Sequence, residues 1–224
     1  MISRPLAAGL AAFALTASAS AQQSAPAALL AAVSATQSAK TPYAFDFNFQ
    51  SAAATFRAHF DPKATPHVTM VEPTQAALSN DQRQVFQQIQ QQLDGVSWCA
   101  GERMGRISNV RLLHEDADSA TYSFQPTRES MRGQAAQYAD RLRGEITITK
   151  GNPDVTAVHI FTPAAFDPIP FVHITTVDVA VSCAAAPNGR RYAAQTVSQT
   201  MGNAFGQAIN QRNVQHVNNL SAAP

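Results

Sequence analysis

The stretch from Phe171 to Cys183 constrains the fold of this chain more than any other. Read with a period of two, one of its faces becomes continuously apolar at Val177, Val179 and Val181, and the other is mixed. This alternation predicts a long β-strand that lies with one face against a core. Its richness in β-branched residues argues against a helix.

The first 21 residues have the features of a secretory signal peptide. Arg4 is followed by an apolar run from Leu6 to Leu15 and by the small-residue ending Ala19-Ser20-Ala21. Charge, apolar run and small residues stand in the order typical of export, and the run is too short to span a bilayer as a helix. We therefore predict cleavage after Ala21 and a bacterial protein that is periplasmic or secreted. The alternative is a buried N-terminal helix.

Cleavage there leaves 203 of the 224 residues, with 15 basic and 15 acidic side chains once Arg4 is removed. A formal charge of zero without a basic run argues against nucleic acid and against an anionic membrane surface as partners. No later apolar run is long enough for a transmembrane segment. The length suits one α+β domain, placed at residues 22–220 and followed by a C-terminal tail at 221–224.

Cys99 and Cys183 are the two cysteines of the chain. In an oxidising compartment such a pair most often forms a disulfide. It would close a loop of about 84 residues and stabilise the fold by up to about 4.5 kcal/mol in the chain-entropy model. Two free thiols in the core are the alternative, and the spacing excludes a Cys-x-x-Cys redox motif.

Helical and strand periodicities alternate in the first half of the mature chain. A short helix is expected within Gln22–Lys40. A second is expected from Ser79, which starts a capping box with Gln82, to Leu93, and its narrow apolar stripe consists of Val85, Phe86, Ile89 and Leu93. Between them, Tyr43–Gln50 and Thr55–Phe60 alternate apolar and polar residues. They predict an antiparallel hairpin whose aromatic face looks inward, followed by a third strand near Pro66–Val71.

The second half of the chain has mainly strand periodicity. Ile107–Leu113 and Thr121–Gln125 are typical of a strand pair, and helical spacing returns from Pro126 to Arg143. From Glu145 to Met201 three or four strands follow one another with short turns, which predicts an antiparallel meander. After Gly202, a weak stripe of Phe205, Ile209 and Val217 predicts a further helix that runs into a polar tail.

No catalytic or metal-binding signature stands out. The six histidines match no metal motif, although His159 and His173 lie on neighbouring predicted strands and could form a paired site. No nucleophile elbow or phosphate-binding glycine loop occurs. Asp46 and Asp178 stand in mid-strand, where they either face solvent and bond across strands or serve in a binding cavity. We therefore expect no enzymatic activity, no cofactor and no metal site.

Apolar sheet faces are the remaining candidates for function. A curled antiparallel sheet whose concavity is not filled by helices can hold an acyl chain or another apolar ligand. The alternative is that the two longer predicted helices fill the space entirely. The candidate ligand-lining residues are Tyr43, Phe45, Phe47, Phe49, Phe56 and Phe60 on one face and Val177, Val179 and Val181 on another.

The order of these elements resembles that of the periplasmic lipoprotein-localisation carriers. The stretches that carry the resemblance are Tyr43–Gln50, Thr55–Phe60 and the meander from Glu145 to Met201. That family has a cleavable signal, an N-terminal helix and a curved antiparallel sheet that forms an incomplete barrel plugged by helices. The resemblance implies a half-barrel that takes up a lipid or a lipoprotein acyl chain. It assigns no site residue to this chain.

The sequence thus predicts an α+β fold in which a curved antiparallel sheet of about seven to nine strands forms an incomplete barrel, with two or three helices on its concave side. The first functional hypothesis is an exported binding or carrier protein for a lipid or another apolar ligand held inside this half-barrel. The second is a structural or adaptor protein of the cell envelope, with a filled core and an envelope protein as its partner.

Overall fold

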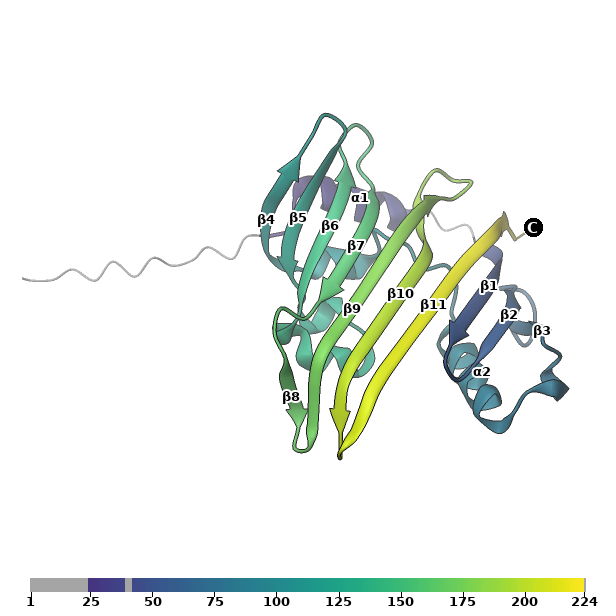
Figure 1. The fold of residues 1–224 in the computed structure, drawn as a ribbon. Coiled ribbons are helices and arrows are strands. Elements are labelled where there is room, and N and C mark those ends of the chain that lie inside the picture. The colour runs from purple at the N-terminus through teal and green to yellow at the C-terminus, as the bar shows by residue number, and fades with distance from the viewer. Residues whose placement is uncertain (1–23, 39–41, 224) are drawn as a thin grey trace, which may run out of the picture.

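One antiparallel sheet runs through most of the chain (Figure 1). The computed structural model describes residues 24–38 and 42–223, so the predicted signal peptide lies outside the described residues. The helices are α1 Ala27–Ser38 and α2 Asn80–Gln92, with 3₁₀ segments η1 Gln75–Ala77, η2 Glu102–Arg106, η3 Arg128–Ser130 and η4 Gly133–Arg141. The strands are β1 Tyr43–Ser51, β2 Thr55–Phe60, β3 Val68–Glu72, β4 Ser108–Glu115, β5 Ser119–Gln125, β6 Arg143–Thr149, β7 Val155–Phe161, β8 Phe166–Ile169, β9 Val172–Ala185, β10 Arg191–Ala204 and β11 Gln207–Ala222.

The sheet is open and has the strand order β3-β2-β1-β11-β10-β9-β7-β6-β5-β4, with β8 beside β9. The α+β class is therefore confirmed, while the expected seven to nine strands are too few, because the sheet has 11. The long strand predicted from Phe171 to Cys183 is β9, which pairs with β7 and β10 near the middle of the order. The meander from β6 to β10 is also confirmed.

The aromatic hairpin is confirmed as β1 and β2, and it packs with α2. Phe45 lies opposite Phe60, and Phe49 lies opposite Phe56. The predicted capping box starts α2: the Ser79 hydroxyl accepts from the Gln82 backbone N–H, and the Ser79 N–H donates to the Gln82 side chain. The stripe of α2 can then bury Phe86, the centre of a first hydrophobic core.

The other end of the sheet packs with α1. Leu29 and Val33 of α1 are buried with Phe124 of β5, Ile146 of β6 and Val158 of β7, and together they form a second core. α1 lies behind the β4–β7 end of the sheet in Figure 1, whereas α2 lies beside β1 and β3 at the opposite end.

A single row of cross-strand partners shows that both cores lie on one face of the sheet. Residues directly opposite each other in an antiparallel ladder share a face. The row runs from β2 to β5 as Phe56, Phe49, Gln215, Thr196, Val181, Val158, Ile146 and Tyr122. We call this face the inner face and the opposite one the outer face.

The helix predicted from Pro126 to Arg143 is wrong. The chain there forms η3 and η4, and η4 is kinked at Tyr138, whose φ and ψ are −113° and 17°. Gly133 has a left-handed φ of 58°, which interrupts any continuous helix. The Gln125 side chain donates to the backbone carbonyls of Ala139 and Leu142 at 2.6 and 2.8 Å, so a tertiary contact satisfies groups that helix hydrogen bonds would otherwise use.

The helix and polar tail predicted after Gly202 are also wrong. This segment is β11, which runs through Ala222 and pairs with β10 on one side and β1 on the other. Its residues include Ser221 and Ala222 of the predicted tail. A strand held by two neighbours gains backbone hydrogen bonds along both edges, and these do not depend on an alternating apolar pattern.

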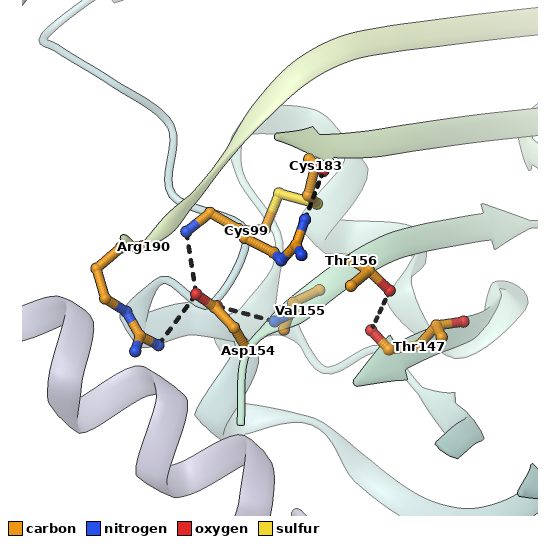
Figure 2. The surroundings of a disulfide bond; sticks show 8 residues. Cys99, Thr147, Asp154, Val155, Thr156, Cys183 and Arg190 are labelled. Atoms are coloured by element: carbon orange, nitrogen blue, oxygen red, sulfur yellow. Dashed lines mark hydrogen bonds and ion pairs between the residues drawn. A yellow bond between two sulfur atoms is a disulfide. The ribbon is translucent and has the colours of Figure 1, made fainter. Parts of the chain in front are cut away.

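The predicted Cys99–Cys183 disulfide is confirmed (Figure 2). Cys99 follows Trp98, which forms an isolated bridge with Tyr192 at the start of β10, and Cys183 lies near the end of β9. The Cys99 N–H donates to the Arg191 carbonyl at 3.0 Å, which holds the irregular segment beside the sheet. The disulfide therefore ties the middle of the chain to β9.

A buried ion pair lies beside the disulfide in Figure 2. The Asp154 carboxylate is 3.3 Å from an Arg190 Nη2, and it accepts hydrogen bonds from the backbone N–H groups of Val155 and Arg191 at 2.8 and 3.0 Å. The same Arg190 nitrogen donates to the Ala32 carbonyl in α1 at 3.1 Å. The pair thus links α1, the turn before β7 and the turn before β10.

No helix within residues 24–38 and 42–223 is both long enough and apolar enough to cross a membrane.

Candidate functional site

The middle of the inner face lies between the two cores. Among the described residues, neither core includes a side chain between Gln195 and Asn213. Strand register places six uncharged polar residues on the inner face here, and we call them the polar stripe. They are Thr196, Ser198 and Thr200 of β10 and Gln211, Asn213 and Gln215 of β11.

The predicted aromatic residues lie almost entirely inside the first core. Phe45, Phe47, Phe49, Phe56 and Phe60 are all buried. Phe45 stacks on Phe60 with ring centroids 4.8 Å apart, and Phe86 of α2 lies edge-on to Phe56 at 5.5 Å. Tyr43 is separate from this cluster and packs edge-on against Trp98 at 5.8 Å. α2 therefore fills most of the space over the aromatic face.

The predicted valines share the inner face with the phenylalanines but do not touch them. Val177, Val179 and Val181 lie opposite Thr200, Ser198 and Thr196, so the polar stripe separates them from β1. Val181 packs against the second core, and Val177 and Val179 are half-buried. The structure therefore brings the two predicted sets onto one face but not into one cavity.

An open groove of about 540 Å³ lies over β11 at the edge of the first core. Its apolar lining is the Phe47 ring with Ile89 and Leu93, which end the stripe of α2. Its polar lining is Gln92, Ser97, Arg132, Gly133 and Gln215. A groove with an apolar wall, amide groups and one guanidinium has the composition of a site for an amphiphilic molecule.

Sequence reasoning found only Phe47 among the residues that line this groove as ligand contacts. Ile89 and Leu93 were assigned to a packing stripe. Arg132 and Gly133 fall in the segment from Pro126 to Arg143, and Gln215 falls in the segment after Gly202. Both segments were predicted to be helical. No local signal marks these positions, because the groove is lined by residues of α2, of β11 and at the start of η4, which are far apart in the chain.

The outer face carries histidine–aspartate pairs. His59 Nδ1 lies 2.8 Å from Asp46 Oδ1, and His159 Nε2 lies 3.0 Å from Asp178 Oδ2. His159 also stacks on Phe161, with ring centroids 4.9 Å apart. Both mid-strand aspartates therefore bond across strands at the surface, one of the two alternatives that the sequence allowed.

The two histidines that the sequence placed on neighbouring strands do not pair with each other, because each contacts a different aspartate. His173 Nδ1 contacts Asp167 Oδ1 at 2.6 Å, and His159 contacts Asp178 instead. No hydrogen bond in the described part of the chain joins His59, His159 or His173 to a serine, threonine or cysteine side chain. These pairs therefore lack the attached nucleophile that acyl-transfer chemistry requires.

Asp46 has an electrostatic environment unlike that of an ordinary surface carboxylate. The Asn219 side-chain amide donates to Asp46 Oδ2 at 2.7 Å. That hydrogen bond, together with the one to His59, lowers the pKa of Asp46 below its usual 3.8. Asp46 therefore acts as an anionic acceptor that fastens β11 and β2 to β1.

Across residues 24–38 and 42–223, no three histidine, cysteine, aspartate or glutamate residues come together where an ion could be held.

Comparison with known proteins gives no assignment for this chain. No protein-family model, no curated protein and no solved structure matches it. No enzyme family is therefore among its matches, and the groove and the histidine–aspartate pairs must be interpreted from their own chemistry.

Proposed function

We propose that this chain is an exported binding or carrier protein that holds an amphiphile, such as a lipid or a lipoprotein acyl chain, in the groove over β11. The observation that carries the proposal is the composition of that groove: Phe47, Ile89 and Leu93 on one side and Arg132 beside uncharged amides on the other. An acyl chain that covers the apolar wall removes apolar surface from water, which favours binding by about 25 cal/mol for each Å² buried.

The polar end of the ligand is expected at Arg132. A guanidinium donates two parallel hydrogen bonds to a carboxylate or phosphate, which a neutral head group cannot accept in the same way. The amides of Gln92 and Gln215 supply further donors and acceptors. The preferred ligand is therefore an anionic amphiphile, with its chain along the phenylalanine side. Export rests on the predicted signal peptide, and a disulfide in the chain is compatible with it.

Uptake of a fluorescent fatty acid tests the proposal. The purified protein should bind it saturably at one site, and native mass spectrometry should detect co-purifying lipid. Arg132→Gln should weaken binding of the acid about tenfold and should change binding of the alcohol of equal chain length less than twofold, because the alcohol has no charge to pair. Arg111→Gln, on exposed β4, is the matched control and should leave both affinities unchanged.

Ile89→Asn examines the apolar wall separately, since it removes a half-buried contact at the groove without replacing a buried ring of the core. It should weaken binding of acid and alcohol alike. If the wild-type protein carries no lipid and shows no saturable uptake, the carrier proposal is wrong.

An envelope structural or adaptor protein is the second candidate, and the packing of the first core supports it. Five predicted ligand-lining phenylalanines are buried under α2, which leaves little of the aromatic face for a ligand. Absence of lipid binding together with capture of a defined envelope protein would favour this function.

A further inference from the structure

Two turns meet at one end of the long strands, at the lower end of the sheet in Figure 1. Pro170 and Phe171 join β8 to β9, and Phe205 and Gly206 join β10 to β11. The Phe205 N–H donates to the Phe171 carbonyl at 2.8 Å, and the two rings lie 6.2 Å apart. The turns are therefore one unit, and we call it the aromatic tip.

The tip exposes the two least buried large apolar side chains among the described residues. Phe171 is 79% exposed and Phe205 is 71% exposed, and Ile169 beside them is 52% exposed. Packing inside this chain does not explain aromatic residues at these positions. Exposing a large apolar side chain to water has a free-energy cost that a polar residue would avoid.

Both phenylalanines also have strained backbones. The φ of Phe171 is 66° and that of Phe205 is 51°, in the left-handed region that asparagine and glycine adopt far more readily. Two exposed phenylalanines in an unfavourable conformation, brought together from two hairpins, indicate a function for the side chains rather than for the turns.

The two turns of the tip contain no charged side chain. No charged residue occurs in 168–172 or in 202–211. Behind the tip, Asp167 is paired with His173 at 2.6 Å. An open hollow bounded by both turns is lined by residues 167–173 together with Asn203, Phe205 and Gly206, so the paired Asp167 and His173 share it with the apolar side chains.

Two backbone N–H groups of the tip are satisfied within the chain. The Phe205 N–H is bonded to the other turn, and the Gly206 N–H donates to the Asn203 side chain at 3.1 Å. Backbone groups that enter lipid must be satisfied internally, because no water is there to receive them. A protein partner would not impose this requirement, since it could supply the missing hydrogen bonds itself.

We propose that the aromatic tip docks this protein on a lipid bilayer by inserting Phe171, Phe205 and Ile169 into the interfacial region. The tip binds through apolar burial and not through charge, so it takes zwitterionic lipid as well as anionic lipid. This inference rests on the tip alone and is independent of the proposed ligand groove.

Co-sedimentation with phosphatidylcholine vesicles tests the inference. The protein is purified after export, and its N-terminus is checked by intact mass so that no apolar signal segment contributes. The wild-type protein should partition onto the vesicles. Its partition coefficient should change by less than about twofold when salt is raised to about 0.5 M. The double variant Phe171→Asn/Phe205→Asn should have a partition coefficient at least about tenfold lower.

Two controls keep the result specific to the tip. Asparagine tolerates a left-handed φ, so the double variant should keep or raise the melting temperature. The matched variant Leu112→Asn/Leu113→Asn removes two leucines that are about half exposed, on β4 at the far edge of the sheet, and should bind vesicles like the wild-type protein.

Insertion has a direct optical readout. Phe205→Trp should give fluorescence that shifts to the blue with vesicles and is quenched by brominated acyl chains, relative to the parent protein that contains only Trp98. The inference is overturned if the wild-type protein does not partition, or if the asparagine double variant partitions equally. It is also overturned if the tip instead mediates a dimer, seen as association without lipid that the double variant abolishes.

Discussion

Asp46 illustrates how one residue connects three strands. It lies opposite His59 on β2 and Asn218 on β11, and the register between β1 and β11 shifts beside it. Asn219 has a left-handed φ of 54° at this irregularity, and its amide reaches Asp46 Oδ2. Asparagine adopts this conformation more readily than most residues, so the bulge and the hydrogen bond are consistent with each other.

The lowered pKa of Asp46 predicts a pH-dependent contribution to stability. A carboxyl whose pKa is lower in the folded chain than in the unfolded chain stabilises the fold at pH values above the unfolded value of 3.8, and the contribution is lost as the pH falls through the folded pKa. Asn219→Gly keeps the left-handed φ but removes the amide. It should raise the pKa of Asp46, measured by carboxyl carbon NMR, and lower the free energy of unfolding at pH 7 by about 0.5 kcal/mol, since the site is largely solvated.

The difference between wild-type and Asn219→Gly stabilities should shrink as the pH falls through the pKa of Asp46 in the folded chain, because the protonated carboxyl no longer accepts these hydrogen bonds as an anion. Asn109→Gly is the matched control, because Asn109 also has a left-handed φ of 51° but lies in β4. It should leave the pKa of Asp46 unchanged. A stability difference that is constant from neutral to acid pH would contradict the assignment.

At the scale of the elements, the pairing of β5 with β6 depends on a missing side chain. Gly144 of β6 lies opposite Phe124 of β5, and a Cβ at Gly144 would overlap the Phe124 ring. The ring therefore covers the glycine and fills the second core next to Ile146. The alternating pattern of β6 can be read from the sequence, but the need for glycine here cannot.

Gly144→Ala should therefore destabilise the protein by about 1–3 kcal/mol, because the Phe124 ring must leave its position in a packed core. Chemical denaturation measures the change. Gly151→Ala is the matched control: it adds the same methyl group where no atom lies within 4 Å and the φ is not left-handed. It should change stability by less than about 0.5 kcal/mol. Equal effects of both substitutions would show that the Phe124 contact is unimportant.

Elements with strong local signals were predicted well. The β1–β2 hairpin and α2 have a buried face opposite a solvated one, so their periodicity is visible in the sequence. β11 has no such pattern: Ile209 and Val217 lie on the inner face, but Val214, opposite Val197, lies on the outer face. Its apolar residues therefore do not alternate as in a half-buried strand, although its two neighbours hold it as a strand.

At the scale of the whole molecule, the two cores are joined by long-range links. The sheet joins them through β9, β10 and β11, and the disulfide fixes the Trp98–Cys99 segment to β9. The buried Asp154–Arg190 pair fastens α1 to the turns before β7 and β10. Breaking one of these links is expected to affect stability more than changing an exposed strand residue.

Removal of the disulfide should lower the free energy of unfolding by up to about 4.5 kcal/mol, because the unfolded chain regains the freedom of a long loop. Cys99→Ala/Cys183→Ala, or the wild-type protein in reductant, provides the comparison in chemical denaturation. Thiol labelling with and without reductant gives the oxidation state. A loss below about 1 kcal/mol would show that the other links hold this end of the fold without the disulfide.

The sequence by itself predicted the α+β class, the strand β9, the aromatic hairpin and α2 with its capping box, and it favoured the pairing of the two cysteines over two free thiols. Each of these depends on short-range periodicity, on a local capping motif or on the presence of just two cysteines. Only the tertiary structure decided that β11 lies between β1 and β10, that α2 covers the phenylalanines, and that Arg132, directly before η4, lies at the groove. It also decided that Phe171 and Phe205 meet at one tip. Such contacts join residues far apart in the chain, and their stability comes from pairing and packing that no local pattern encodes.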